Sequence, residues 1–205
     1  MTDLGQLQYF LGLEVSQTQD GGFISQEKYA QSLLIKFGMK DCNGEDVPMS
    51  SYDKYQADDG EDKVDETKYR SLVGGLIYLT HTRPDLAYAV GVLSRFMQSP
   101  SKIHVGAARK ILRYVASTSE YGIWYKKNDK LKLVGYSDSD WAACVDDRKS
   151  VGAYVFAVGS GVVSWSSKKQ NTVALSSTEA EYISATSATC QGIWIRRILE
   201  DLGHV

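Results

Sequence analysis

The chain has 205 residues, 43% of them hydrophobic, and its 23 Lys/Arg against 25 Asp/Glu give a formal net charge of -2. This composition is enough to bury a core and excludes wholesale disorder. Three widely separated cysteines argue against a zinc ribbon or a disulfide-stapled secreted scaffold: Cys42, Cys144 and Cys190. No signal peptide and no run of apolar residues long enough to span a membrane is visible, so the sequence predicts a soluble intracellular protein without membrane contact.

Charge is divided unevenly along the chain. Residues 1–65 hold 5 Lys/Arg and 13 Asp/Glu, whereas residues 66–205 hold 18 and 12. Only the second part has the sign that favours a polyanion. Its excess is modest, and an ordinary solvated mixture of charges is the simpler explanation.

The first 65 residues predict a hairpin, a helix and a connector. Residues 9–15 and 23–25 are rich in strand formers and flank a turn at Gly21-Gly22. Ser25 can cap a helix that runs through Phe37, and Gly38 can end it in a left-handed conformation. Residues 40–65 are acidic, turn-rich and almost free of large aliphatic side chains, which predicts an extended connector.

Three helices are expected next, because apolar residues recur at three- and four-residue steps. They begin near Glu66, at Pro84 and after Ser101. The third helix carries Arg109, Lys110 and Arg113. We expect these basic residues to form a solvated face rather than a dedicated binding patch.

After Gly122 the pattern changes to the alternation typical of strands. Four strands are predicted, at residues 123–125, 131–136, 153–158 and 162–165. A long helix should then run from about Ser177 toward Leu202, with Gly192 as a possible break and Gly203 at its end.

Four carboxylates stand where chemistry is possible. Asp138 and Asp140 follow a predicted strand, and Glu179 and Glu181 lie in the first turns of the last helix. Turn formation and the helix dipole explain such acids without any ligand. The functional alternative is that Asp138 and one of the glutamates bind Mg²⁺, which prefers oxygen ligands.

Ordered motifs favour the functional alternative. The runs VGYSDSDWA, DRKS, SWSSKKQ and ALSSTEAEY occur at residues 134–142, 147–150, 164–170 and 174–182. Together they resemble the ribonuclease H region of Ty1/copia-type retrotransposon polyproteins. Residues 3–5 with 9–15, 69–74 and 78–85 look like the end of the reverse transcriptase and its connection in the same polyproteins.

The resemblance implies an α+β fold and four segments. Residues 1–39 would be a reverse-transcriptase remnant of hairpin and helix, followed by the acidic connector 40–65 and a helical connection 66–118. Residues 119–205 would form a truncated ribonuclease H-like domain, with a mixed sheet and one long C-terminal helix.

The resemblance also implies roles for individual residues. Asp138 matches the first-strand aspartate of the family, and Glu181 matches the first-helix glutamate because an apolar pair follows it. In the family, four acids hold two Mg²⁺ ions that activate water against an RNA–DNA hybrid. Arg148, Lys168 and Lys169 would contact nucleic acid, although the lysine pair is equally typical of plain surface.

Departures from the family pattern predict an incomplete catalyst. The third family aspartate ordinarily follows the position of Leu202-Gly203, the fourth acid lies farther downstream, and the reverse-transcriptase acids would precede Met1. Residues 131–136 should then expose a strand edge that can pair with another protein chain. Ala143 stands where the family usually has glycine.

Two other functions remain open. The chain could be an active nuclease in which Asp140, Asp146 or Asp147 serves as a substitute ligand, or in which a partner chain adds the missing strand. It could instead be a redeployed interaction protein, such as a pathogen effector that is secreted and delivered into a host plant cell.

Overall fold

The computed structural model describes residues 7–50, 52–127 and 131–204. The chain forms two compact units, the first made of 1–53 and 57–127 and the second of 54–56 and 128–205. The described residues form five α-helices and two antiparallel sheets, which confirms the α+β prediction. The motif at residues 3–5 lies outside the described residues.

The sheet of the first unit has the order β1-β2-β3-β4. Its strands are β1 (Tyr9–Phe10), β2 (Leu13–Gln17), β3 (Gly21–Ser25) and β4 (Gly122–Lys126). The predicted hairpin is confirmed, with Gln17 opposite Gly22. β4, however, pairs with β3 and not with the ribonuclease H-like segment to which its residues had been assigned. Glycine permits this approach, since a Cβ on Gly21 would lie 2.1 Å from the Tyr125 carbonyl oxygen.

Helices α1 (Glu27–Lys36), α2 (Glu66–Leu79), α3 (Ala87–Leu93) and α4 (Lys102–Ser117) complete the first unit. Gly38 follows α1 with φ of +65°, as predicted. Gln26, not Ser25, precedes α1, because Ser25 is held in β3 opposite Gly122. The Ser101 hydroxyl accepts a hydrogen bond from the His104 amide and caps α4, as the sequence indicated.

The core of the first unit lies among α2, α3 and α4. It contains the largest fully buried side chains, among them Tyr69, Leu76, Leu93, Ile111 and Leu112. The Tyr69 hydroxyl donates to the Leu93 carbonyl over 2.9 Å, so its polar end is satisfied within the core.

A buried arginine ties the start of α3 to the end of α4. Arg83 is 3% exposed and contacts the Asp85 carboxylate at 2.7 Å. It donates to both the carbonyl and the hydroxyl of Thr118, each over 2.8 Å. Its guanidinium also lies 5.4 Å from the ring centroid of Tyr114 and 5.3 Å from that of Tyr121. This residue is therefore desolvated, paired and hydrogen-bonded at once.

The described residues of the connector form no helix or strand, but the segment is not detached from the helices. Lys110 pairs with Asp53 and Arg113 pairs with Glu45. The prediction of a solvated face for these two basic residues is therefore wrong, because acids distant in sequence cover them.

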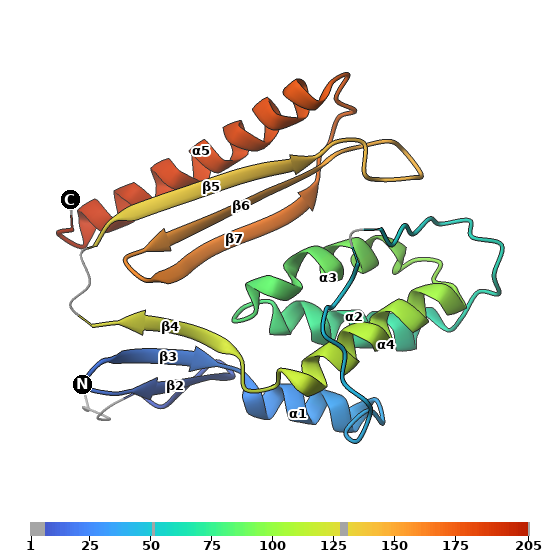
Figure 1. Cartoon of the computed structure of the whole chain (residues 1–205), viewed down its shortest axis with the longest axis horizontal. Helices are drawn as coiled ribbons and strands as arrows, with labels where there is room; N and C mark the ends of the chain where they lie inside the picture. The colour runs from blue at the N-terminus through green and yellow to red at the C-terminus, as the bar shows by residue number, and fades with distance from the viewer. Residues whose placement is uncertain (1–6, 51, 128–130, 205) are drawn as a thin grey trace. The chain divides into compact units, whose positions relative to one another are not determined.

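The second unit is a three-stranded sheet with one helix, in the order β5-β6-β7. Its elements are β5 (Leu133–Asp140), β6 (Val151–Val158), β7 (Gly161–Lys169) and α5 (Ser177–Asp201). Figure 1 shows α5 lying along this sheet. The expected mixed sheet is not what the described strands form: all pair antiparallel, because each follows its neighbour through a direct connection.

Phe156 organises the core of the second unit with Ala188 and Ile195. Its ring fits against two glycines: a Cβ added at Gly135 would lie 2.2 Å from Phe156 Cε1, and one added at Gly192 would lie 3.1 Å from it. Gly192 therefore does not break α5; it makes room for the ring. Among the described residues, no helix is both long and apolar enough to cross a membrane.

Candidate functional site

The two predicted catalytic carboxylates lie on elements that are joined by a hydrogen bond. Asp138 is near the end of β5 and Glu181 is in the second turn of α5, and both are exposed. The Ser184 hydroxyl, one turn after Glu181, donates to the Asp138 carbonyl over 2.6 Å. The end of β5 is thus fixed to the part of α5 that carries Glu181.

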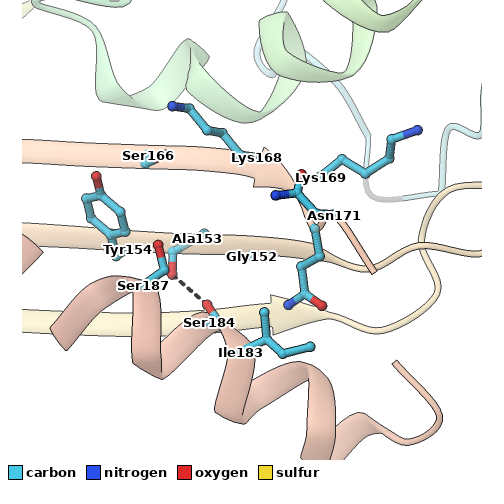
Figure 2. A pocket seen from close by; sticks show the side chains of 11 residues that line it. Gly152, Ala153, Tyr154, Ser166, Lys168, Lys169, Asn171, Ile183, Ser184 and Ser187 are labelled. Carbon is cyan, nitrogen blue, oxygen red and sulfur yellow. Dashed lines mark hydrogen bonds between the residues drawn. The ribbon is translucent and has the colours of Figure 1, made fainter. Parts of the chain in front are cut away.

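Small residues allow this approach of the helix to the sheet. Ser184 also contacts the Ala153 carbonyl at 3.2 Å, the interaction drawn as a dashed line in Figure 2. A Cβ on Gly152 would lie 3.2 Å from the Ser184 hydroxyl oxygen, so a side chain there would crowd the Ser184 contact. No motif had indicated Ser184, since a serine inside a helix gives no signal of a contact so distant in sequence.

The other two candidate acids serve local structure or face solvent. The Glu179 carboxylate accepts from the Leu175 amide over 2.7 Å, and Ser176 accepts from the Glu179 amide over 3.1 Å. This reciprocal arrangement caps the start of α5. Asp140 is exposed at the end of β5.

The donor set does not fit a pair of magnesium ions. Two divalent ions at one site need several shared oxygen ligands to offset their mutual repulsion. In the part of the chain that the structure describes, no group of three or more His, Cys, Asp or Glu side chains is placed to hold a metal ion. Asp140, Asp146 and Asp147 are thus not gathered with Asp138 and Glu181 into such a group.

An ion-paired loop lies between β5 and β6. The Lys169 ammonium lies 2.8 Å from the Asp147 carboxylate and 3.9 Å from the Cys144 sulfur. Partial burial opposes ionisation of Asp147, but hydrogen bonds from Lys169 and Cys144 outweigh it and lower its pKa to about 2. The Lys169 ammonium is therefore already paired with the Asp147 carboxylate of the same chain.

The other two predicted nucleic-acid contacts face solvent. Lys168 and Arg148 are both exposed, and Arg148 has a left-handed backbone with φ of +56°. In Figure 2 the side chains of Lys168 and Lys169 extend away from α5. Lys168 and Lys169 lie at the end of β7, and Arg148 lies in the loop that connects β5 to β6.

A pocket of about 270 Å³ lies between α5 and strands β6 and β7. Tyr154, Ser166 and Lys168 line it from the sheet, and Ile183 and Ser187 line it from the helix (Figure 2). Hydroxyl groups and two lysines, Lys168 and Lys169, suit a polar or anionic group. The sequence did not predict this pocket, because its lining comes from three separate segments.

Comparison with known proteins places the chain in a family. It is 42% identical over 201 residues, 98% of its length, to the retrovirus-related Pol polyprotein from transposon RE1 of Arabidopsis thaliana. It is also 38% identical over 195 residues to an uncharacterized mitochondrial protein of that plant, of which it covers 80%. The chain is homologous to the Ty1/copia Pol polyproteins over nearly its whole length.

This Pol-related chain spans 14% of the length of the RE1 polyprotein. It is also 51% identical over 128 residues to a secreted RxLR effector protein of Plasmopara viticola, covering 90% of that protein and 62% of this chain. No protein-family model and no solved structure matches the chain. The resemblance seen in the motifs is thereby confirmed at the level of the polyprotein family.

Proposed function

We propose that this chain corresponds to the stretch of a copia Pol polyprotein that joins the end of the reverse transcriptase to the start of ribonuclease H. We further propose that these 205 residues, taken alone, do not cleave RNA–DNA hybrids. The observation that carries the second statement is the donor set, because two exposed carboxylates are not joined by a third acid among the described residues.

The order of elements in the second unit supports the proposal. Three sequential antiparallel strands precede a long helix, and Ser184 fixes the strand of Asp138 to the helix of Glu181. In the proposed assignment, these two acids are the part of a Mg²⁺ site that this chain supplies. Completion of the site requires carboxylates from outside the described residues.

Hybrid cleavage tests the proposal directly. An end-labelled RNA–DNA hybrid is incubated with the purified chain and with its Asp138→Asn and Glu181→Gln variants, in Mg²⁺ or Mn²⁺. We expect no cleavage above the protein-free blank from any of the three. Cleavage by the parent chain that both substitutions abolish would overturn catalytic incompleteness and would show that other ligands complete the site.

Binding without cleavage is the second part of the proposal. We assign Arg148 and Lys168 to contacts with the hybrid backbone, because both are exposed beside the pocket of Figure 2 or on its neighbouring loop. If Lys168 makes one phosphate contact, Lys168→Gln should reduce the slope of log binding constant against log salt concentration by about 0.9. An unchanged slope would remove Lys168 from the interface.

The outer edge of β5 is the proposed contact for a protein partner. Within the described residues β5 pairs only with β6, which leaves its other edge without a strand. Backbone groups on such an edge can pair with a strand of another chain.

The effector relative supports a second candidate function. The effector is 51% identical to this chain, whereas the RE1 polyprotein is 42% identical. The aligned region covers 90% of the effector's length. In this alternative the chain is a secreted protein that acts in a host plant cell. Detection of the mature chain outside its source cell, or inside a recipient cell, would favour it over the polyprotein role; confinement to the source cell would contradict it.

A further inference from the structure

Four basic residues of α4 share one face of the helix. At 100° per residue, positions 102, 109, 110 and 113 fall within a sector of about 100°. They are Lys102, Arg109, Lys110 and Arg113, here called the basic stripe. The buried face of the same helix carries Ala108, Ile111, Leu112 and Val115. With a rise of 1.5 Å per residue, the stripe is about 16 Å long.

The acidic connector covers this stripe in reverse order. Glu45 pairs with Arg113 at 2.5 Å and Asp53 pairs with Lys110 at 3.5 Å. Asp62 pairs with Lys102 at 2.5 Å. The connector therefore runs antiparallel to α4 and places one carboxylate on each of three of the four cations. Arg109 is exposed and has no ion pair among the described residues.

The two ends of the connector are held differently. Near the start of α4, Ser101 donates its hydroxyl to Asp59, the Val64 amide donates to the Pro100 carbonyl over 2.9 Å, and Asp62 accepts from the Lys102 amide over 3.2 Å. At the other end, the Glu45 carboxylate pairs with Arg113, and the Glu45 carbonyl accepts a hydrogen bond from the Ser117 hydroxyl.

The ion pairs with Glu45 and Asp53 are partly exposed, with side-chain exposures between 27% and 41%. Ion pairs at such exposure contribute little to stability and are screened by salt. The part of the connector over Lys110 and Arg113 can therefore be displaced while its other end stays anchored at Ser101.

We propose that the basic stripe of α4 binds the phosphate backbone of a nucleic acid, and that the acidic connector occupies it as an internal polyanion. The Arg113 guanidinium pairs with the Glu45 carboxylate, and its geometry is equally suited to a phosphate. The choice of nucleic acid as partner rests on the proposed Pol-derived function, but the surface belongs to the first unit, whereas Asp138 and Glu181 belong to the second.

Two variants that each lose three carboxylates, and therefore have the same net charge, test this proposal. In the release variant, Glu45→Gln, Asp53→Asn and Asp62→Asn remove the three carboxylates from the stripe. The control, Asp41→Asn, Asp46→Asn and Glu61→Gln, makes the same change of charge in the same connector at acids that form no ion pair with α4 among the described contacts. Asp59 stays unchanged in both, which keeps the anchor at Ser101.

Binding of a fluorescein-labelled 16-base-pair RNA–DNA hybrid is followed by anisotropy with the full chain at several salt concentrations. We expect the release variant to bind at least about tenfold more tightly than the control at low salt, with a log–log salt slope steeper by about 2 to 3. Adding Lys110→Gln and Arg113→Gln to the release variant should remove the gain.

Each other result has a definite meaning. Equal binding by release and control variants would overturn the proposal and would leave the stripe as a docking face for the connector alone. A gain that persists without Lys110 and Arg113 would also overturn it, since the new contacts would then lie elsewhere. Circular dichroism of each variant confirms folding, and single substitutions at Glu45 or Asp53 give the same ordering if the triple variant unfolds. Hybrid cleavage is measured separately, so failure here leaves the proposed function intact.

Discussion

The two units of the chain bury different kinds of core. Among the described residues, the largest fully buried side chains lie in the first unit, most of them in helices α2 to α4. The second unit has a small buried cluster of Phe156, Ala188 and Ile195, against which partly buried side chains such as Tyr154 pack. Several of its large apolar side chains stay exposed, including Tyr136, Ile193, Trp194 and Leu202. Apolar burial therefore accounts for a smaller share of the stability of the second unit.

Polar contacts also differ between the units. In the first, Arg83 is fully desolvated and connects two helices, and Gln26 accepts from the Thr82 hydroxyl over 2.9 Å in the interior. In the second, the Asp147–Lys169 pair is partly exposed. The difference indicates that buried polar contacts stabilise the first unit. The second unit depends instead on close contacts of small residues around its candidate site.

The largest expected effect comes from Arg83→Ala in the first unit. This change removes the ion pair with Asp85 and two hydrogen bonds to Thr118 from a buried site. We expect a loss of about 3 kcal/mol in the free energy of unfolding. Hydrogen exchange of the α3 and α4 peptides, measured in the full chain, reports the loss in the unit concerned.

Arg70→Ala is the matched control. Arg70 pairs with Glu66 at 2.9 Å, but both side chains are about half exposed. The expected loss is below about 1 kcal/mol. If the two arginine variants lose equal stability, the contrast between a buried network and surface pairs is mistaken.

Gly135→Ala should destabilise the second unit without affecting the first. The new Cβ would lie 2.2 Å from Phe156 Cε1, so the ring must move out of its place between Gly135 and Gly192. Overpacking of this kind costs about 2 kcal/mol. Adding Phe156→Leu to Gly135→Ala should recover part of the lost stability. Hydrogen exchange of the α5 peptides measures the stability of the single and the double variant.

Gly74→Ala should change the stability of the first unit in the opposite direction, that is, raise it. No heavy atom lies within 4 Å of a Cβ at this position, which is inside α2. Replacing an unhindered helical glycine by alanine should raise stability by about 0.5–1 kcal/mol. A loss at Gly74, or no loss at Gly135, would show that space around the glycines does not decide the outcome.

Acid should weaken the second unit through Asp147. Its pKa in the folded protein is about 2, below the ordinary value of 3.8, so the stabilisation is present above the unfolded pKa and is lost as the pH falls from about 4 to 2. Because the side chain is 35% exposed, screening reduces the effect to about 1 kcal/mol or less. Urea unfolding at pH 5 and pH 2.5 should show a smaller loss in Asp147→Asn than in the parent chain, with Asp140→Asn behaving like the parent.

Local signals in the sequence were sufficient for the helices and for the hairpin. Ser101 and Gly38 mark ends of helices through their own backbone chemistry, and alternation marks the strands. The partner of β4 could not be predicted, because its pairing with Phe23 joins residues about a hundred positions apart. The pairing of Lys110 with Asp53 was missed for the same reason.

The candidate site was predictable only where a motif marks it. The resemblance singled out Asp138 and Glu181, whose roles stay predictions, and the sequence order of strands and helix was right. No pattern marks Ser184, which connects their elements. Gln170 ends one of the motifs, but the motif does not indicate that its amide donates to the Ala180 carbonyl over 2.9 Å. Such contacts depend on how closely the helix approaches the sheet, and this follows from packing.

The smallest expected effect separates two neighbouring alanines in the loop after β5. The family pattern drew attention to Ala143, but the left-handed backbone is at Ala142, with φ of +52°. The Ala142 amide donates to the Ser150 hydroxyl over 3.1 Å, so the strained conformation is held in place. Ala142→Gly should gain about 0.5 kcal/mol, because relief of strain exceeds the entropy that glycine adds to the unfolded chain. Ala143→Gly receives no such relief and should lose a similar amount. The two urea midpoints should therefore move in opposite directions, and a shared direction would mean that the backbone angle at Ala142 does not set the stability of this loop.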